Sequence, residues 1–311
     1  MYLIDLHCDT LYKSITNNIF LDDISMENRL DIDGMHKLQC YAIWIPDGIS
    51  GSEAEKLFYR AYERLADEAN RLSIKLIGFE EKYNSQIFDY KNSAYFTIEN
   101  ASAVNGKLEN IEKFAKLGVK IITLTWNSSN QIGDGASVIQ PEGLSNFGKL
   151  AVKEMEKWGI IIDISHASDK LFYDVAGIST KPLIATHSNS RCITNHKRNL
   201  TDEQAKHIAS SNGIIGLNFH NEFLNNDSEK ACIFDIIRHA EHFLSLGLEN
   251  NICIGTDFDG CTLPEGIKGS ENMADIYEMF LKHNYKESVI NKIFYGNAHK
   301  FFENFDNQRI M

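Results

Sequence analysis

The chain has 311 residues, of which 43% are hydrophobic and 24% are charged. This composition is typical of a globular protein and excludes a disordered, collagen-like or coiled-coil chain. The 31 basic and 43 acidic residues give a formal net charge of −12, so nucleic acid and anionic membrane surfaces are poor partners. The length suits a single domain over residues 1–311, because α/β barrels reach about 250 residues or more as one unit.

Eight short apolar runs, rich in β-branched and aromatic residues, predict strands that are buried on both faces. In chain order they span residues 2–6, 39–45, 94–99, 120–126, 159–165, 182–187, 213–219 and 251–258. Amphipathic segments predict helices over residues 54–72, 107–117, 145–157, 168–177, 201–211 and 232–246. This alternation predicts a (β/α)8 TIM barrel. A doubly wound open sheet is the alternative, and the lack of a G-x-G-x-x-G sequence after the first run disfavours it.

Local signals mark several helix ends. Thr201, followed by two acidic residues, predicts an N-cap. Glycines stand where four of the predicted helices should end, at Gly118, Gly159, Gly213 and Gly247. Residues 17–37 and 72–90 fit the alternation poorly, and we expect insertions or an extra hairpin there.

Six cysteines are scattered without a C-x-x-C pair, and Cys8, Cys40 and Cys253 lie in apolar, strand-like runs. This pattern favours free thiols in a reducing compartment over a disulfide framework. The first residues lack a basic segment followed by a long apolar run, and no run of about 18 apolar residues follows. The last residues are too polar for a lipid-anchor signal. We therefore expect a cytoplasmic protein without a membrane anchor.

Ionisable residues that can bind metals end or follow five of the predicted strands. They are His7, Asp9, Glu99, His166, His187 and Asp257. In an α/β barrel the carboxyl ends of the strands form one rim, and that rim carries the active site. The six residues together predict a metal site there.

The spacing of these residues suggests how they divide between ions. His7 and Asp9 are two positions apart at a strand end, so their side chains point to the same side. Imidazole and carboxylate together suit zinc, manganese or iron(II). Glu99 has two oxygens that could span two ions, and His166 and His187 would hold the second ion.

Each of these residues has a plainer interpretation when it is taken alone. A histidine near a strand end is more often a hydrogen-bonded packing residue than a ligand, and Asp257 suits a turn or a helix start. Asp163 is interpreted as a structural acid within its strand. His220 follows GLNF on the same rim and is a weaker candidate, for substrate contact or support. The sequence contains no G-x-S-x-G elbow, so it does not favour a serine nucleophile.

Six longer segments carry a resemblance to a known family. They are DLHCDTL at 5–11, the segment 143–168, THSNSR at 186–191, HKRNLTDEQ at 196–204, GLNFHNEF at 216–223 and GTDFDG at 255–260. In order, and over nearly the whole chain, the sequence resembles the membrane dipeptidase (renal dipeptidase) family of the amidohydrolase superfamily. The resemblance implies a (β/α)8 barrel, a binuclear zinc centre and hydrolysis of dipeptides.

The resemblance assigns the ligands to the two zinc ions. His7 and Asp9 match the ligands of one ion, and Glu99 matches the carboxylate that bridges both. His166 and His187 match the ligands of the other ion. A metal-bound hydroxide would then attack the scissile carbonyl.

Two further residues receive roles from the resemblance. Asp257 matches the acid/base that handles the proton of the attacking water and of the leaving amine. Arg198 matches the arginine that holds the C-terminal carboxylate of the substrate, for which a guanidinium offers a bidentate fork. Taken alone, Arg198 beside Lys197 would be interpreted as a surface arginine.

The chain departs from the family at two positions of the rim. Trp126 stands where mammalian members have a histidine that resembles an oxyanion contact, and indole offers only one N–H donor. We expect Trp126 to line the substrate pocket. Asn100 follows Glu99 where members commonly have glycine.

We therefore predict a zinc-dependent dipeptidase that acts on small dipeptides, with assembly as a homodimer left open. A related barrel hydrolase of another amide, a lactone or an N-acyl amino acid is one alternative, which Trp126 motivates. A metal-binding homologue without turnover is the other, and the presence of Asp257 argues against it.

Overall fold

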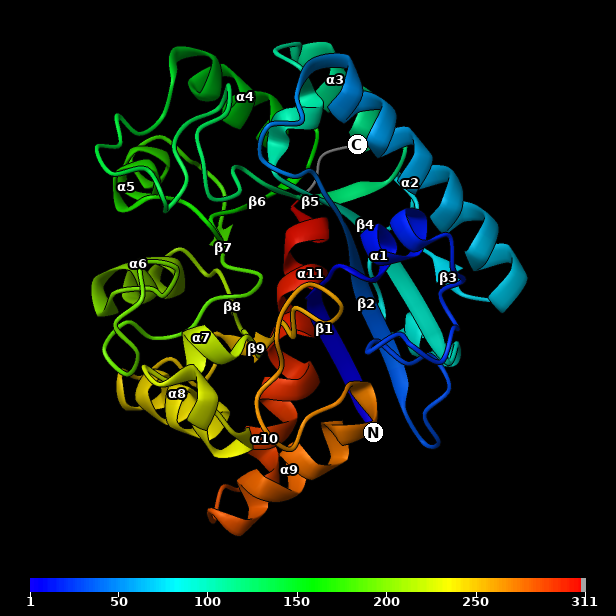
Figure 1. Cartoon of the computed structure of the whole chain (residues 1–311), viewed down its shortest axis with the longest axis vertical. Coiled ribbons are helices and arrows are strands. Elements are labelled where there is room, and N and C mark those ends of the chain that lie inside the picture. The colour runs from blue at the N-terminus through cyan, green and yellow to red at the C-terminus, as the bar shows by residue number, and fades with distance from the viewer. Residues whose placement is uncertain (309–311) are drawn as a thin grey trace.

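A parallel sheet that curls into a barrel forms the centre of the molecule (Figure 1). The computed structural model describes residues 1–308. Its strands are β1 (Tyr2–Cys8), β2 (His36–Trp44), β3 (Lys75–Leu76), β4 (Asn92–Glu99), β5 (Val119–Thr123), β6 (Ile161–Asp163), β7 (Leu183–Ile184), β8 (Ile215–Leu217) and β9 (Ile252–Ile254). The strand order is β7-β6-β5-β4-β2-β1-β9-β8, and a bridge between Ala185 and Ile215 joins its two ends. The predicted barrel is confirmed, and the open sheet is wrong.

Helices surround the sheet, and Figure 1 shows α2 to α6 and α8 as an outer ring. The helices are α1 (Thr10–Asn17), α2 (Gly51–Leu72), α3 (Leu108–Lys116), α4 (Asn146–Lys157), α5 (Asp169–Ala176), α6 (Asp202–Ser210), α7 (Asn221–Leu224), α8 (Ile233–Ser245), α9 (Met273–Lys282), α10 (Glu287–Asn291) and α11 (Asn297–Asn307). Short helical segments are η1 (Ser85–Asp89), η2 (Ala101–Val104), η3 (Ser228–Lys230), η4 (Ser270–Asn272) and η5 (Lys292–Gly296). Each of the six predicted helices is present.

The end of α6 corrects one sequence prediction. Thr201 caps the helix as expected, in a reciprocal capping box with Gln204. At the other end, Asn212 takes the left-handed conformation with φ 61°, and the φ of Gly213 is not positive. Gly213 is needed for a different reason, because a Cβ there would lie 1.8 Å from the Leu183 carbonyl oxygen. The prediction that glycines follow the other three helices holds, with positive φ at each.

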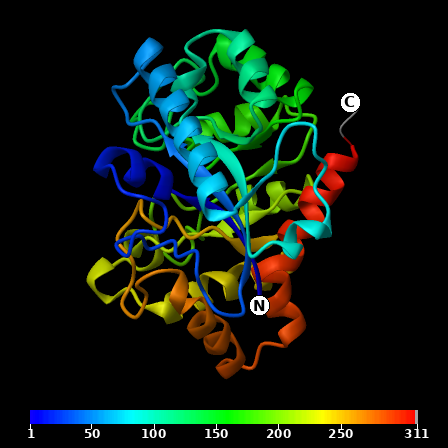
Figure 2. The same ribbon diagram turned by 90° about the vertical axis from the view of Figure 1, so that its right-hand side faces the viewer.

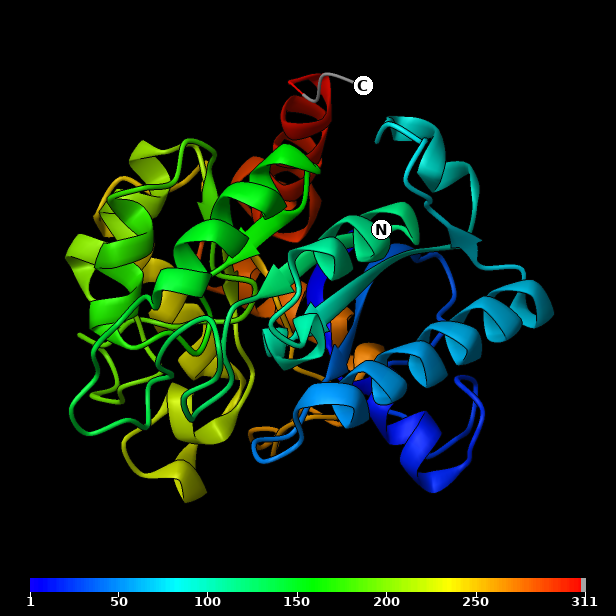
Figure 3. The same ribbon diagram turned by 90° about the horizontal axis from the view of Figure 1, so that it is seen from above.

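The two stretches that fit the alternation poorly are mostly irregular. Residues 72–90 contain β3, which pairs in parallel with β4, so the expected hairpin is wrong. Residues 19–35 form turns and loops between α1 and β2. Helix α1 was not predicted. Figure 3 shows it beside α2, whose Arg60 donates a hydrogen bond to the Ile15 carbonyl at 2.7 Å.

The core has one layer between the sheet and the outer helices and a second layer inside the barrel. The inner layer contains inward strand residues together with Phe301, Phe302 and Phe305 of α11. A buried ion pair between Lys120 of β5 and Asp306 fixes α11 against the amino ends of the strands. Figure 2 shows α1 and α11 on opposite sides of the barrel. One end of the barrel is thus packed with aromatic side chains, and the carboxyl end remains for a site.

Three cysteines occupy the strands expected for them, since Cys8, Cys40 and Cys253 are buried with free thiols. Over residues 1–308, no helix is both long enough and apolar enough to cross a membrane.

Candidate metal centre

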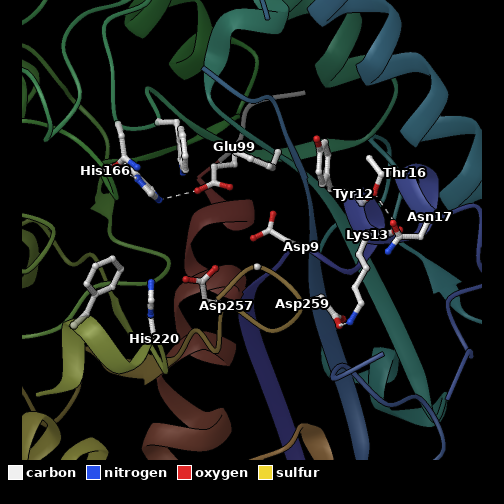
Figure 4. Close-up of a pocket in the computed structure, with 15 residues that line it drawn as sticks. Asp9, Tyr12, Lys13, Thr16, Asn17, Glu99, His166, His220, Asp257 and Asp259 are labelled. Atoms are coloured by element: carbon white, nitrogen blue, oxygen red, sulfur yellow. Dashed lines mark hydrogen bonds and ion pairs between the residues drawn. The ribbon is translucent and has the colours of Figure 1, made fainter. Parts of the chain in front are cut away.

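Six buried side chains converge at the carboxyl ends of the strands, and we call them the rim cluster. Figure 4 shows four of them, Asp9, Glu99, His166 and Asp257. They are His7 in β1, Asp9 just after it, Glu99 at the end of β4, His166 after β6, His187 after β7 and Asp257 after β9. The structure therefore brings together all six residues that the strand-end pattern singled out.

The backbone is shaped locally to aim these side chains. The pairing of β1 with β2 shifts register between Asp5 and Cys8, and such irregularities re-aim side chains at barrel rims. His166 and Asp257 take left-handed φ values of 66° and 64°. Non-glycine residues in this conformation carry backbone strain, which accumulates at functional sites.

His7 faces all three carboxylates of the rim cluster. Its Nε2 lies 3.6 Å from an Asp9 oxygen and 3.7 Å from oxygens of both Glu99 and Asp257. Burial disfavours the charged imidazole, but Glu99, Asp9 and Asp257 outweigh it and raise the His7 pKa to about 10. His7 Nε2 and Asp9 Oδ1 are buried without a hydrogen-bond partner among the described residues. The three carboxylates therefore favour a cation beside His7 Nε2 and Asp9 Oδ1, two atoms that lack a hydrogen bond from the described residues.

The other two imidazoles are held as neutral acceptors. The Thr186 hydroxyl donates to Asp163 at 2.6 Å, so it accepts from His187 Nδ1 at 2.8 Å. Asn127 Oδ1 accepts from His166 Nδ1 at 3.0 Å. Burial lowers the pKa of both histidines. Each Nε2 therefore carries a lone pair. Histidines that bind metals commonly have the opposite ring nitrogen fixed by such a hydrogen bond.

Three electron-pair donors meet in this half of the rim cluster. The Nε2 atoms of His166 and His187 are 3.0 Å apart, and Glu99 Oε1 lies 2.8 Å from the first and 3.6 Å from the second. Burial raises the pKa of Glu99 well above its usual range, and Asp9 adds to this. A divalent cation would offset the cost of burying the Glu99 charge and would bind the lone pairs of the two neutral imidazoles. The residues fit a metal centre.

The possible ligands form overlapping groups. In one group, atoms of His7, Asp9 and Glu99 lie within 4.8 Å of one another, and in a second so do atoms of Glu99, His166 and His187. A third such group joins His7, His187 and Asp257. Glu99 belongs to the first two groups, which are the two ligand sets expected from the sequence.

Asp257 has one oxygen fixed and one near the imidazole of His7. Its Oδ2 accepts a hydrogen bond from Asn218 Nδ2 at 3.0 Å, and its Oδ1 is the atom that lies 3.7 Å from His7 Nε2. Its side chain lines the cavity described below. Asp163, by contrast, is wholly buried and accepts four hydrogen bonds, one from Thr123, one from Ser165 and two from Thr186, as expected for a structural acid.

A cavity of about 340 Å³ opens over the rim cluster, a size within the range of small-molecule sites. Trp126 and His220, both expected near the substrate, line it. The sequence did not single out the other lining residues, which are Tyr12, Lys13, Thr16, Asn17, Trp44, Asn127, Phe223, Asp259 and Gly260. Of these, Gly260 has a steric reason, because a Cβ there would lie 1.9 Å from Asp9 Oδ2.

Arg198 is buried beside the rim cluster, which corrects its interpretation as a surface residue. It donates to the His187 carbonyl at 3.2 Å, and its guanidinium lies 5.3 Å over the Phe223 ring. Burial lowers its pKa to about 10, against the attraction of Asp257 and Glu99. Its Nε is buried without a hydrogen-bond partner among the described residues. Arg198 lines a small cavity next to His166 rather than the larger one.

Asn100 explains how the chain tolerates the loss of glycine after Glu99. Its φ is 72°, a conformation that glycine adopts without strain. The asparagine side chain accepts hydrogen bonds from Ser102 and Asn130 and donates to the Ile45 carbonyl at 2.8 Å. Asparagine tolerates a positive φ better than most residues with a Cβ, and these hydrogen bonds hold it there.

Comparison with known proteins identifies a family whose model matches nearly the whole chain. The model of the membrane dipeptidase family (peptidase family M19) matches residues 1–309. The crystal structure of a family M19 dipeptidase is 27% identical, with a TM-score of 0.89 over 97% of this chain and 98% of that chain. A metallopeptidase from Rhodobacter sphaeroides, liganded with a phosphinate mimic of the dipeptide L-Ala-D-Ala, is 25% identical, with a TM-score of 0.88 over 97% and 99%.

Two curated proteins are similar in sequence to this chain. An uncharacterized protein in the pqqA 5′ region of Klebsiella pneumoniae is 31% identical over 216 residues, 67% of this chain and 80% of its own length. An uncharacterized dipeptidase of Schizosaccharomyces pombe is 30% identical over 190 residues, 60% of this chain and 45% of its own length. The chain belongs to the membrane dipeptidase family, peptidase family M19, and is a hydrolase of peptide bonds.

Proposed function

We propose that this enzyme is a zinc-dependent dipeptidase with two metal ions. His7 and Asp9 would hold one ion, His166 and His187 the other, and Glu99 would contact both. The observation that carries this proposal is the meeting of the His166 and His187 Nε2 atoms and a Glu99 oxygen within 2.8–3.6 Å of one another. Imidazole and carboxylate ligands suit zinc.

Bound metal ions supply a Lewis acid for the scissile carbonyl and lower the pKa of a water molecule. The protein's own part in proton transfer falls to Asp257. Asn218 holds one of its oxygens, and the other is free to accept the proton of the attacking water and to deliver it to the departing amine.

The buried guanidinium of Arg198 would bind the C-terminal carboxylate of the dipeptide. Its support is the unpartnered Nε and the position beside the rim cluster. His220 and Phe223 line the cavity on this side, and we propose that His220 contacts the substrate there.

Free dipeptides should be hydrolysed, and their C-terminal amides should be hydrolysed poorly, because the amide removes the charge that Arg198 binds. Arg198→Lys should raise KM more than it lowers kcat, since an ammonium cannot reproduce the bidentate fork. Steady-state kinetics on a dipeptide and its amide measure both effects. Equal kcat/KM values for the two substrates would contradict this role.

Trp126 could supply the N–H that the missing histidine does not. The indole is half-buried, lines the cavity, and its ring centroid lies 6.0 Å from that of His166. If it donates to the developing oxyanion, Trp126→Phe should lower kcat by about 100-fold with an unchanged Tm. Trp126→His should preserve or raise activity on dipeptides. Unchanged turnover in Trp126→Phe would leave this residue as a wall of the cavity.

Trp126 also motivates the second candidate, a barrel hydrolase of another amide, a lactone or an N-acyl amino acid. A substrate panel decides between the two candidates.

We further propose one hydrolase domain over residues 1–311, because strands from residue 2 to residue 254 share one sheet. A cytoplasmic location is proposed from the six free thiols, which a reducing compartment preserves.

A further inference from the structure

Three aromatic side chains form a continuous wall along one side of the cavity. Tyr12 of α1 packs edge-on against Trp44 at the end of β2, with ring centroids 4.7 Å apart. Trp44 packs in the same way against Trp126, at 4.9 Å. All three are half-buried and line the cavity. We call them the aromatic wall.

The Tyr12 end of the aromatic wall lies across Asp9 from His220, on the side of the rim cluster away from Phe223 and Arg198. Figure 4 shows Tyr12 on one side of Asp9 and His220 on the other. The His220 ring contacts the Phe223 ring at 4.5 Å, and the Arg198 guanidinium lies over that same ring. A dipeptide with its carboxylate at Arg198 and its scissile carbonyl at the rim cluster would therefore extend its N-terminal residue toward the Tyr12 end of the aromatic wall.

A charged residue beside the aromatic wall, Lys13, is already paired with an acidic one. Lys13, next to Tyr12, forms an ion pair with Asp259 at 2.8 Å. The oxygens of Asp259 also accept hydrogen bonds from Thr10 and from the backbone of Glu27. This pair therefore leaves no strong preference for an acidic or a basic side chain at that end of the cavity.

We propose that the aromatic wall binds a large apolar or aromatic side chain on the N-terminal residue of the dipeptide. This inference rests on the proposed dipeptidase function and names its substrate class. Ring edges and faces offer an apolar side chain extensive contact, and aromatic pairs add to the energy of burial. Trp44 also has a buried indole N–H without a hydrogen-bond partner among residues 1–308, a donor that a bound ligand can use.

The test compares kcat/KM for a dipeptide series with a constant C-terminal alanine. Phe-Ala and Leu-Ala should exceed Ala-Ala by about 10- to 100-fold, the factor expected from burying a large apolar side chain. Glu-Ala and Lys-Ala should fall well below Phe-Ala. Tyr12→Ala should reduce the ratio of Phe-Ala to Ala-Ala at least about fivefold, and Tyr12→Phe, which keeps the ring, should retain it.

Tyr173→Ala is the matched control, because Tyr173 is an exposed aromatic residue on the outer helix α5. It should leave the ratio unchanged. If the wild-type enzyme hydrolyses all members of the series equally well, the inference is wrong and the dipeptidase function stands. If the enzyme hydrolyses no dipeptide, the proposed function fails and this inference fails with it. The wild-type series decides the matter even if a Tyr12 variant does not fold.

Discussion

Asp257→Asn should retain both metal ions and lower kcat by at least about 100-fold, the usual effect of removing a positioned acid/base. The amide has nearly the shape of the carboxylate and can keep a hydrogen bond with Asn218. It cannot accept the proton of the attacking water. Steady-state kinetics and elemental analysis of the same preparation measure the two effects separately.

Asp67→Asn is the control for this experiment, because Asp67 is exposed on α2, far along the chain from the rim residues. It should be active at the wild-type level. Near wild-type turnover in Asp257→Asn would remove Asp257 from the mechanism. Loss of metal from that variant would instead make Asp257 a ligand, as its group with His7 and His187 allows.

Elemental analysis of the enzyme purified without chelator should give about two metal ions per chain. His187→Ala should reduce this value to about one, because the second ion loses one of its two imidazole ligands. Loss of a residue that only supports a metal ligand typically lowers activity by about 10- to 100-fold. Loss of His187, a proposed ligand itself, should lower activity by more than that.

The matched control is His283→Ala, which removes an exposed histidine at the end of α9. Its metal content should equal that of the wild type. A reproducible value near zero in the wild-type enzyme after reconstitution with zinc would refute the binuclear site.

The strands and the rim cluster could be predicted because both depend on local sequence. A run such as GIIIDIS is apolar on both faces, so it predicts a buried parallel strand even though β6 itself spans three residues. The topology then places every strand end on the same rim. The sequence alone could therefore predict that His166 and His187 lie close together.

The walls of the cavity could not be predicted in this way. Tyr12 and Trp44 contact each other through the packing of α1 against the barrel, and no sequence spacing relates them. Asp9 is a residue type that commonly caps helices, but at the start of α1 its side chain makes no cap hydrogen bond, and its carboxylate belongs to the rim cluster instead. Asn127 supports His166 across 39 positions of the chain, a contact that only the folded barrel creates.

The neighbouring positions of β1 and β9 have a consequence for how this enzyme folds. Asp5 pairs with Ile254 in the sheet, so the barrel closes only when segments about 250 residues apart along the chain meet. Closing so long a loop costs chain entropy before any contact compensates it, and such topologies fold slowly. His7 and Asp257 flank this junction and come together only at that step. A metal ion bound by both halves of the rim would favour the closed barrel over partly folded states, and the yield of folded enzyme would then depend on the supply of metal.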